Sequence, residues 1–182
     1  MRRFGIRVAA STLFLLAGVF SAAEPAAAPQ PSPEQKKLGY FVGNWKSEGT
    51  VKENPFMPAG KMTSTDRCTW FEGGFAVVCD TQGSGPMGTM KGIGIMGYSV
   101  EEKVYTYFGL DNSGMSMTTI PRGTVTGADW VYEDESTMGG KKIKSRYALT
   151  EISPTEYTFR WQMVNDKGAW VTLMEGTSRK TK

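Results

Sequence analysis

Hydrophobic and polar side chains alternate with a period of two along most of this chain, from about residue 44 onward. The segment YTFRWQM (157–163) is typical, because its aromatic residues fall on one face and its polar residues on the other. A period of two is that of a β-strand, in which successive side chains point to opposite faces. The pattern predicts ten strands: Asn44–Lys52, Lys61–Phe71, Phe75–Gln82, Thr89–Tyr98, Lys103–Leu110, Ser116–Pro121, Thr124–Glu133, Lys141–Leu149, Glu156–Val164 and Ala169–Thr177.

Short sequences rich in turn-forming residues separate these predicted strands. They are NPFMPAG, EGG, GSGPMG, SVEE, DNSG, PRG, TMGG, ISP and NDKG. Connections this short predict an all-β, antiparallel meander, and an up-and-down β-barrel of about ten strands is the closed form that leaves no open edge. A barrel of that size has room for more than its own side chains, so we expect an interior cavity.

A short helix is predicted before the first strand. Ser32 is a good N-cap, Pro33 suits the first helical position, and Gly43 is a suitable stop. Leu38 and Phe41 fall on one side of this helix, so we expect it to cover one end of the barrel.

Glycines occur inside one predicted strand, in MKGIGIMGY (90–98). The two isoleucines of this segment face one way, and its inner glycines, with Met90 and Met96, face the other. Glycine inside a strand marks a bend or a close approach to the backbone, and we expect one of the two here.

The first 23 residues have the layout of a secretory signal peptide. Arginines in MRRFGIR precede the uncharged run VAASTLFLLAGVF, and SAA offers small residues at a cleavage site. The run is short for a membrane span, although a retained anchor is the alternative. We expect a signal peptide over residues 1–23, a flexible Pro/Ala-rich tether over 24–32 and one barrel domain over 33–182. The mature protein would be secreted or periplasmic, with no membrane span.

Charge and composition exclude several functions. The chain has 21 Lys+Arg and 18 Asp+Glu, and three of its arginines belong to the predicted signal peptide, which leaves 18 of each sign. A domain with balanced charge is a poor candidate for nucleic acid. There is no histidine, which removes Ser-His-Asp catalysis and His-ligated zinc, copper and haem. We expect no cofactor and no metal.

The 11 methionines leave one metal hypothesis open. Thioether sulfur binds Cu(I), and Met87, Met90 and Met96 lie close together in the sequence, as do Met115 and Met117. Methionines also line adaptable hydrophobic cavities, and we favour that interpretation over copper.

The two cysteines, Cys68 and Cys79, lie in CTWFEGGFAVVC. A two-residue hairpin turn at Gly73-Gly74 places them directly opposite each other, within reach of a disulfide. With that turn they form a hydrogen-bonded pair, in which the strands stand farther apart. In an exported protein the pair should oxidise. We favour a structural disulfide, and a redox site is the alternative.

The sequence shows no clear catalytic constellation. Ser113 is close to Asp111 in DNSG but has no histidine and no obvious lysine to activate it, and DNSG is a good turn. The glutamates are scattered, without the spacing of a carboxylate pair. Lys46 and Lys91 would serve as bases only if they were buried.

Four segments resemble the domain-of-unknown-function 1579 family: LGYFVGNWKSEGT, CTWFEGGFAVVCD, GIGIMGYSVEEKVYTYFGLDNSG and YTFRWQMVNDKGAWVTLMEGTSRK. The resemblance extends from about Pro33 to the C-terminus. The family has no established activity, so the resemblance implies no function.

The sequence GNWK (43–46) also resembles the first-strand signature of the calycins, which include lipocalins and fatty-acid-binding proteins. This resemblance implies that Trp45 packs against an arginine near the end of the barrel and closes its base by a cation–π contact. Arg179 is the matching residue. Some related ten-stranded barrels bind haem through histidine, which this chain lacks. Fatty-acid-binding proteins hold a carboxylate with an Arg-x-Tyr pair, for which Arg160 and Gln162 are the substitute here.

We interpret the protein as a non-catalytic binding module for a small apolar or amphipathic molecule. The alternatives are a structural or interaction domain with a fully packed barrel, and an enzyme that uses a buried lysine or carboxylate. Arg160 is the best polar anchor, although it cannot face inward together with its neighbour Trp161. The predicted ligand-binding residues are Trp70, Tyr105, Tyr107, Phe108, Asp111, Trp130, Arg160 and Trp161.

Overall fold

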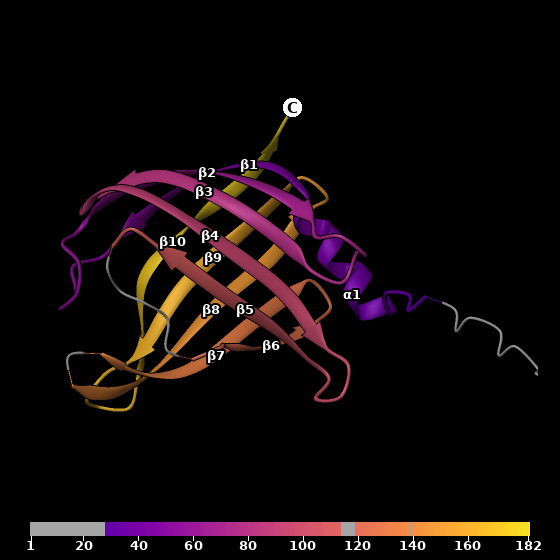
Figure 1. Ribbon diagram of the computed structural model, residues 1–182. Helices are drawn as coiled ribbons and strands as arrows, with labels where there is room; N and C mark the ends of the chain where they lie inside the picture. The colour runs from indigo at the N-terminus through magenta and orange to yellow at the C-terminus, as the bar shows by residue number, and fades with distance from the viewer. Residues whose placement is uncertain (1–27, 114–118, 139) are drawn as a thin grey trace, which may run out of the picture.

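The computed structural model describes residues 28–113, 119–138 and 140–182, and its main feature is a closed β-barrel (Figure 1). Each strand pairs antiparallel with the next along the chain, and β1 pairs with β10 to close the ring. The predicted all-β, up-and-down barrel of ten strands with a short N-terminal helix is confirmed. The elements are α1 (Pro33–Lys37), the 3-10 helix η1 (Leu38–Phe41), β1 (Gly43–Val51), β2 (Gly60–Trp70), β3 (Val77–Gly85), β4 (Gly88–Ser99), β5 (Val104–Asp111), β6 (Arg122–Thr126), β7 (Asp129–Met138), β8 (Lys141–Ser153), β9 (Glu156–Val164) and β10 (Trp170–Thr181). The predicted signal peptide lies outside the described residues.

α1 and η1 lie at one end of the barrel (Figure 1). Ser32 caps α1 as predicted, because its Oγ accepts a hydrogen bond from Gln35 N at 3.2 Å while its own N donates to Gln35 Oε1 at 2.7 Å. Leu38 and Phe41 are buried. Trp45 Nε1 donates to the Phe41 carbonyl oxygen at 2.7 Å, which ties the helix to the first strand. We call this the helix end of the barrel, and the opposite end, with the β1–β2, β3–β4, β7–β8 and β9–β10 turns, the far end.

A hydrophobic core fills the barrel at the helix end. Its aromatic rings make edge contacts, with the Trp130 centroid 5.0 Å from that of Phe41 and 4.9 Å from that of Tyr105. The buried members of this core are Leu38, Phe41, Trp45, Cys68, Val77, Cys79, Met96, Tyr105, Trp130, Tyr132, Leu149 and Phe159.

The sixth and seventh strands differ from the prediction. The predicted strand Thr124–Glu133 is in fact two strands, β6 and β7, joined by a tight turn at Gly127, whose φ is +59°. Glycine adopts this conformation without strain, while the hydrophobic alternation runs on across the turn and conceals it. The predicted strand Ser116–Pro121 falls partly outside the described residues, and residues 119–121 are not in a strand.

The disulfide between Cys68 and Cys79 is confirmed, and so is the register that pairs them. The turn is longer than predicted, however, because Phe71 N donates to the Ala76 carbonyl oxygen and the loop spans residues 72–75. This moves the cysteines from a hydrogen-bonded to a non-hydrogen-bonded pair. Their Cα atoms are 4.0 Å apart, which is nearer to the roughly 4.5 Å of such a pair than to the roughly 5.5 Å of a hydrogen-bonded one.

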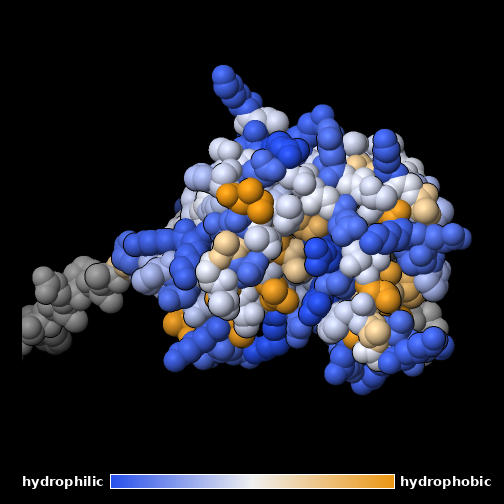
Figure 2. Space-filling model, turned by 180° about the vertical axis from the view of Figure 1, so that it is seen from behind, coloured by the Kyte–Doolittle hydropathy of each residue, from blue (hydrophilic) through white to orange (hydrophobic). Residues whose placement is uncertain are grey.

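The outer surface follows the predicted alternation. Ile93 and Ile95 point outward and are 41% and 38% exposed, whereas Met90 and Met96 face the interior. The face seen in Figure 2 is mostly hydrophilic, with hydrophobic side chains in small separate groups. Among the described residues, no helix has the length and apolarity needed to cross a membrane.

Candidate functional site

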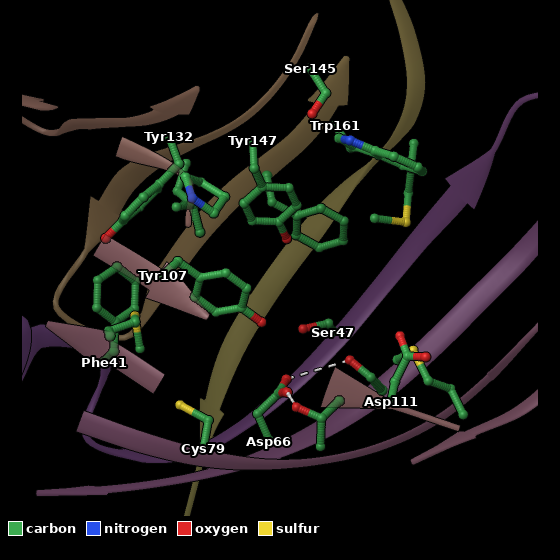
Figure 3. A pocket seen from close by; sticks show the side chains of 18 of the residues that line it. Phe41, Ser47, Asp66, Cys79, Tyr107, Asp111, Tyr132, Ser145, Tyr147 and Trp161 are labelled. Atoms are coloured by element: carbon green, nitrogen blue, oxygen red, sulfur yellow. Dashed lines mark hydrogen bonds between the residues drawn. The ribbon is translucent and has the colours of Figure 1, made fainter. Parts of the chain in front are cut away.

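The barrel encloses a cavity of about 700 Å³ that extends from the core at the helix end toward the far end. Pockets of this size hold small organic molecules. The walls come from strands all around the barrel (Figure 3). The lining residues are Phe41, Trp45, Ser47, Phe56, Met62, Ser64, Asp66, Cys68, Cys79, Thr81, Met90, Met96, Tyr107, Asp111, Pro121, Tyr132, Asp134, Ser136, Thr137, Ser145, Tyr147, Leu149, Tyr157, Phe159, Trp161 and Met174.

Glycines on neighbouring strands make room for the aromatic rings of the wall. A Cβ atom at Gly94 would lie 2.9 Å from Tyr107 Oη, and one at Gly123 would lie 2.6 Å from Tyr132 Cε1. The ring of Tyr107 therefore crosses the backbone of β4 and reaches toward β3 and β2. The glycines of segment 90–98 thus mark a close approach to the backbone, one of the two roles expected from the sequence.

Asp66 brings a carboxyl group to the cavity wall from the middle of β2 (Figure 3). Thr81 Oγ1 donates to Oδ1 at 2.5 Å, and Ser64 Oγ donates to Oδ2 at 3.4 Å. Burial raises the pKa of Asp66, and the hydrogen bonds from Thr81 and Ser64 lower it in part. The charged form of this carboxyl group is therefore less well solvated than it would be in water.

Four tyrosines share the cavity with Asp66. Burial is the main cause that raises the pKa of the Tyr107, Tyr132, Tyr147 and Tyr157 phenols. The negative charge of Asp66 further raises the pKa of Tyr107, Tyr147 and Tyr157. These three phenols therefore interact electrostatically with one carboxylate. The phenols stay neutral at physiological pH and can donate hydrogen bonds.

Two more carboxylates face the cavity, and each accepts a hydrogen bond from a neighbouring described residue. Asp111 Oδ1 accepts a hydrogen bond from Ser113 N at 2.8 Å, and Asp134 Oδ1 accepts one from Thr119 Oγ1 at 2.5 Å. Asp66 and Asp111 lie in the same cross-strand row, with Thr81 and Gly92 between them.

Five of the predicted ligand-binding residues lie inside the barrel. Tyr107, Asp111 and Trp161 come together on the cavity wall, where their contact with a ligand stays a prediction. Tyr105 and Trp130 are 4% and 1% exposed in the core at the helix end. Burial raises the pKa of Tyr105 to about 12, and its hydroxyl donates to the Glu34 carbonyl oxygen of α1 at 3.1 Å.

The other three point away from the cavity. Trp70 is 38% exposed and packs outside the barrel, where a Cβ at Gly39 would lie 3.1 Å from its ring. Phe108 falls on the outer face because its neighbour Tyr107 faces inward. Arg160 Nε lies 3.7 Å from Glu175 Oε2 on the exterior. Alternation turns Arg160 outward once Trp161 faces the cavity, so the prediction that Arg160 anchors a ligand there is wrong.

The base of the barrel is closed by a different cation from the one predicted. Trp45 is 1% exposed, and Lys180 Nζ lies 4.9 Å from the centroid of its ring. Lys180 is also the residue directly opposite Trp45 in the β1–β10 pair. Arg179 points the other way and pairs with Glu156 at 2.9 Å, so Lys180 takes the role predicted for Arg179.

Ser64, Asp66, Thr81, Tyr147 and Tyr157 are lining residues that the sequence did not single out. The sequence held one indication for Asp66, because a period of two places it on the same strand face as Cys68. Alternation alone does not show whether that face points into the barrel, and nothing in the local sequence distinguishes Asp66 from a solvent-exposed acidic residue.

The remaining catalytic candidates lie outside the cavity. Lys46 is exposed and pairs with Glu48 at 3.0 Å, and Lys91 is exposed on β4. Ser113 belongs to the turn closed by its backbone hydrogen bond to Asp111.

The methionines divide between the cavity and the surface. Met90 and Met96 line the cavity, Met87 is 59% exposed, and Met115 and Met117 lie outside the described residues. Within residues 28–113, 119–138 and 140–182, no three His, Cys, Asp or Glu side chains are grouped so that they could hold a metal ion.

Comparison with solved structures shows the same fold in distant proteins. The S-type phycobiliprotein lyase CPES from Guillardia theta has 14% sequence identity and a TM-score of 0.59, with 82% of this chain and 93% of that chain covered. Rv2717c from M. tuberculosis has the same identity and TM-score, with 84% and 100% covered. A protein of unknown function from the DUF3598 family of Nostoc punctiforme has 12% identity and a TM-score of 0.53, with 86% and 53% covered. At these identities the likeness concerns the fold alone.

Comparison at the level of sequence families gives one match. No curated protein matches the chain. The family described as "Protein of unknown function (DUF1579)" matches residues 30–180, which span the whole barrel and its N-terminal helix. The expected resemblance is confirmed, and the chain belongs to the DUF1579 family.

Proposed function

We propose that the mature protein is an exported, non-catalytic binding protein that holds one small apolar or amphipathic molecule inside its barrel. The cavity of about 700 Å³ carries this proposal. A barrel packed with its own side chains would leave no such space, because protein interiors are close-packed. The fully packed structural domain is therefore the less favoured alternative.

The chemistry of the wall supports an organic ligand. The rings of Tyr147, Phe159 and Trp161 and the thioethers of Met62 and Met90 offer apolar, adaptable contact surface. Hydroxyl groups interrupt this surface at intervals, which suits a molecule with one polar group. The likeness in fold to a phycobiliprotein lyase at 14% identity transfers no lyase activity to this chain.

A neutral solvatochromic dye, Nile red, tests the proposal directly. We expect saturable one-to-one binding, with quenching of Trp161 because its indole lines the cavity. Ser145→Phe should weaken binding, since Ser145 lies beside Trp161 on the wall (Figure 3) and a phenyl group there takes up part of the space next to the indole. Thr158→Phe is the matched control, because Thr158 is exposed on the exterior of β9.

The outcomes separate the hypotheses. Binding that Ser145→Phe weakens and Thr158→Phe leaves unchanged supports the interior site. Absence of saturable binding, or equal binding by both variants, overturns the proposal. A separate experiment is native and denaturing mass spectrometry of the mature protein purified from the exporting host. The spectra would identify any molecule that co-purifies with the protein and would show the cleavage site.

A further inference from the structure

The cavity has acidic groups and lacks basic ones. Its lining includes Asp66, Asp111 and Asp134, whereas no lysine or arginine lines it within the described parts of the chain. None of these three carboxylates forms an ion pair with a described residue; the ion pairs lie on the exterior, as with Lys46–Glu48 and Arg160–Glu175. The barrel therefore separates its charges, with paired ions outside and unpaired carboxylates inside.

Asp66 is the carboxylate most in need of a cationic partner. It accepts hydrogen bonds from Thr81 and Ser64, while an ionised carboxylate offers about four acceptor sites. Both donors are neutral hydroxyl groups, and a charge facing an apolar cavity is costly unless it is paired. A cation in the cavity would supply the missing compensation.

Tyrosine rings share the cavity wall with Asp66. Tyr107 reaches across Gly94 toward it (Figure 3), and the carboxylate also acts electrostatically on Tyr147 and Tyr157. The faces of tyrosine rings attract ammonium groups, most strongly where water is excluded. A carboxylate within a group of such rings is an arrangement suited to an organic cation.

An unpaired phenol provides an independent sign of a missing partner. Tyr132 is 4% exposed and lines the cavity, and its hydroxyl group has no hydrogen-bond partner among the described residues. Buried polar groups are nearly always paired in native proteins. The Tyr132 hydroxyl is thus a buried donor at the cavity wall that the described residues leave unsatisfied.

We propose that the cavity takes an amphipathic organic cation, whose ammonium group pairs with Asp66 between the tyrosine rings and whose apolar part lies along the methionines and Trp161. This inference rests on the proposed function and specifies its ligand class. It also implies selection against anions, because a carboxylate or sulfate head would meet three negative groups and no cation.

The test compares three probes with the same ten-carbon chain in displacing Nile red below their micelle concentrations: decyltrimethylammonium, 1-decanol and decanoate. We expect the cation to bind about tenfold or more tightly than the alcohol, and decanoate to bind most weakly. Asp66→Asn should weaken cation binding by about tenfold, measured relative to the affinity of the same variant for decanol. Asp80→Asn is the matched control, because Asp80 is exposed on the adjoining strand β3 and pairs in register with Arg67.

Each result has a distinct meaning. Tight, Asp66-dependent binding of the cation supports the inference. Equal affinities for the three probes, or cation binding that Asp66→Asn does not weaken, overturns the cationic ligand class while the interior binding site stands. If Nile red itself does not bind, the proposed function fails first. The ranking of probes on the unaltered protein decides the matter even if Asp66→Asn does not fold.

Discussion

Removal of the Cys68–Cys79 disulfide should lower the free energy of unfolding by an amount that depends on the length of the loop it closes. The bridge closes a loop with a sequence separation of 11. In the chain-entropy account, a loop of that length lowers the entropy of the unfolded chain by about 9 cal/mol/K, which is about 2.8 kcal/mol of stability at 25 °C. The register of β2 and β3 is also held by backbone hydrogen bonds, so the reduced protein should remain a folded barrel.

The measurement is urea unfolding followed by tryptophan fluorescence, on the oxidised protein, on the protein with excess dithiothreitol, and on the variant Cys68→Ala/Cys79→Ala. We expect the free energy of unfolding to fall by about 2–3 kcal/mol on reduction. The double variant should lose somewhat more, because both side chains are buried and alanine leaves a void.

The dye affinity provides the second measurement. A structural bridge predicts that reduction lowers stability and leaves Nile red binding unchanged. A loss of less than about 0.5 kcal/mol would refute the loop-entropy argument. A large change in dye affinity at constant stability would instead favour the redox interpretation, since both cysteines line the cavity.

Three further substitutions, one of them a control, test the packing and the electrostatics. Gly176→Ala should destabilise the barrel by about 3 kcal/mol, because the added Cβ would clash with the Glu48 carbonyl oxygen. Gly85→Ala is the control and should be nearly neutral in the same urea assay, because a Cβ there would make only an ordinary contact of 3.5 Å with Met62. Asp66→Asn should stabilise the protein at pH 7. Burial raises the folded-state pKa of Asp66, so the wild-type protein loses stability as the pH rises through that pKa. Below about pH 4 the carboxyl group is protonated in both the folded and the unfolded state, and the advantage of asparagine should vanish. An advantage that persists unchanged at pH 3 would contradict the assigned cause.

The fold followed from the sequence wherever alternation and turn chemistry agreed. β9 begins and ends where the period of two predicts, because its aromatic residues and the ISP and NDKG turns give the same boundaries. The division between β6 and β7 was missed because Gly127 and Ala128 form a two-residue turn inside a continuing pattern. The pairing of the two cysteines was predicted correctly, but the turn was not. The longer loop keeps Cys68 opposite Cys79 and makes them a non-hydrogen-bonded pair in place of a hydrogen-bonded one.

The cavity was harder to predict, because its chemistry depends on which face of each strand points inward. Alternation states that Arg160 and Trp161 face opposite ways, but it assigns neither to the interior. Choosing Arg160 as the anchor implied a cavity for anions; the structure instead puts Trp161 inside and pairs Arg160 with Glu175 outside. On β2, the face that carries Asp66 points inward. The faces that β9 and β2 turn inward thus give the cavity an acidic polar group in place of the expected basic one, so the charge of the polar group on an amphipathic ligand is the property that tests this assignment most directly.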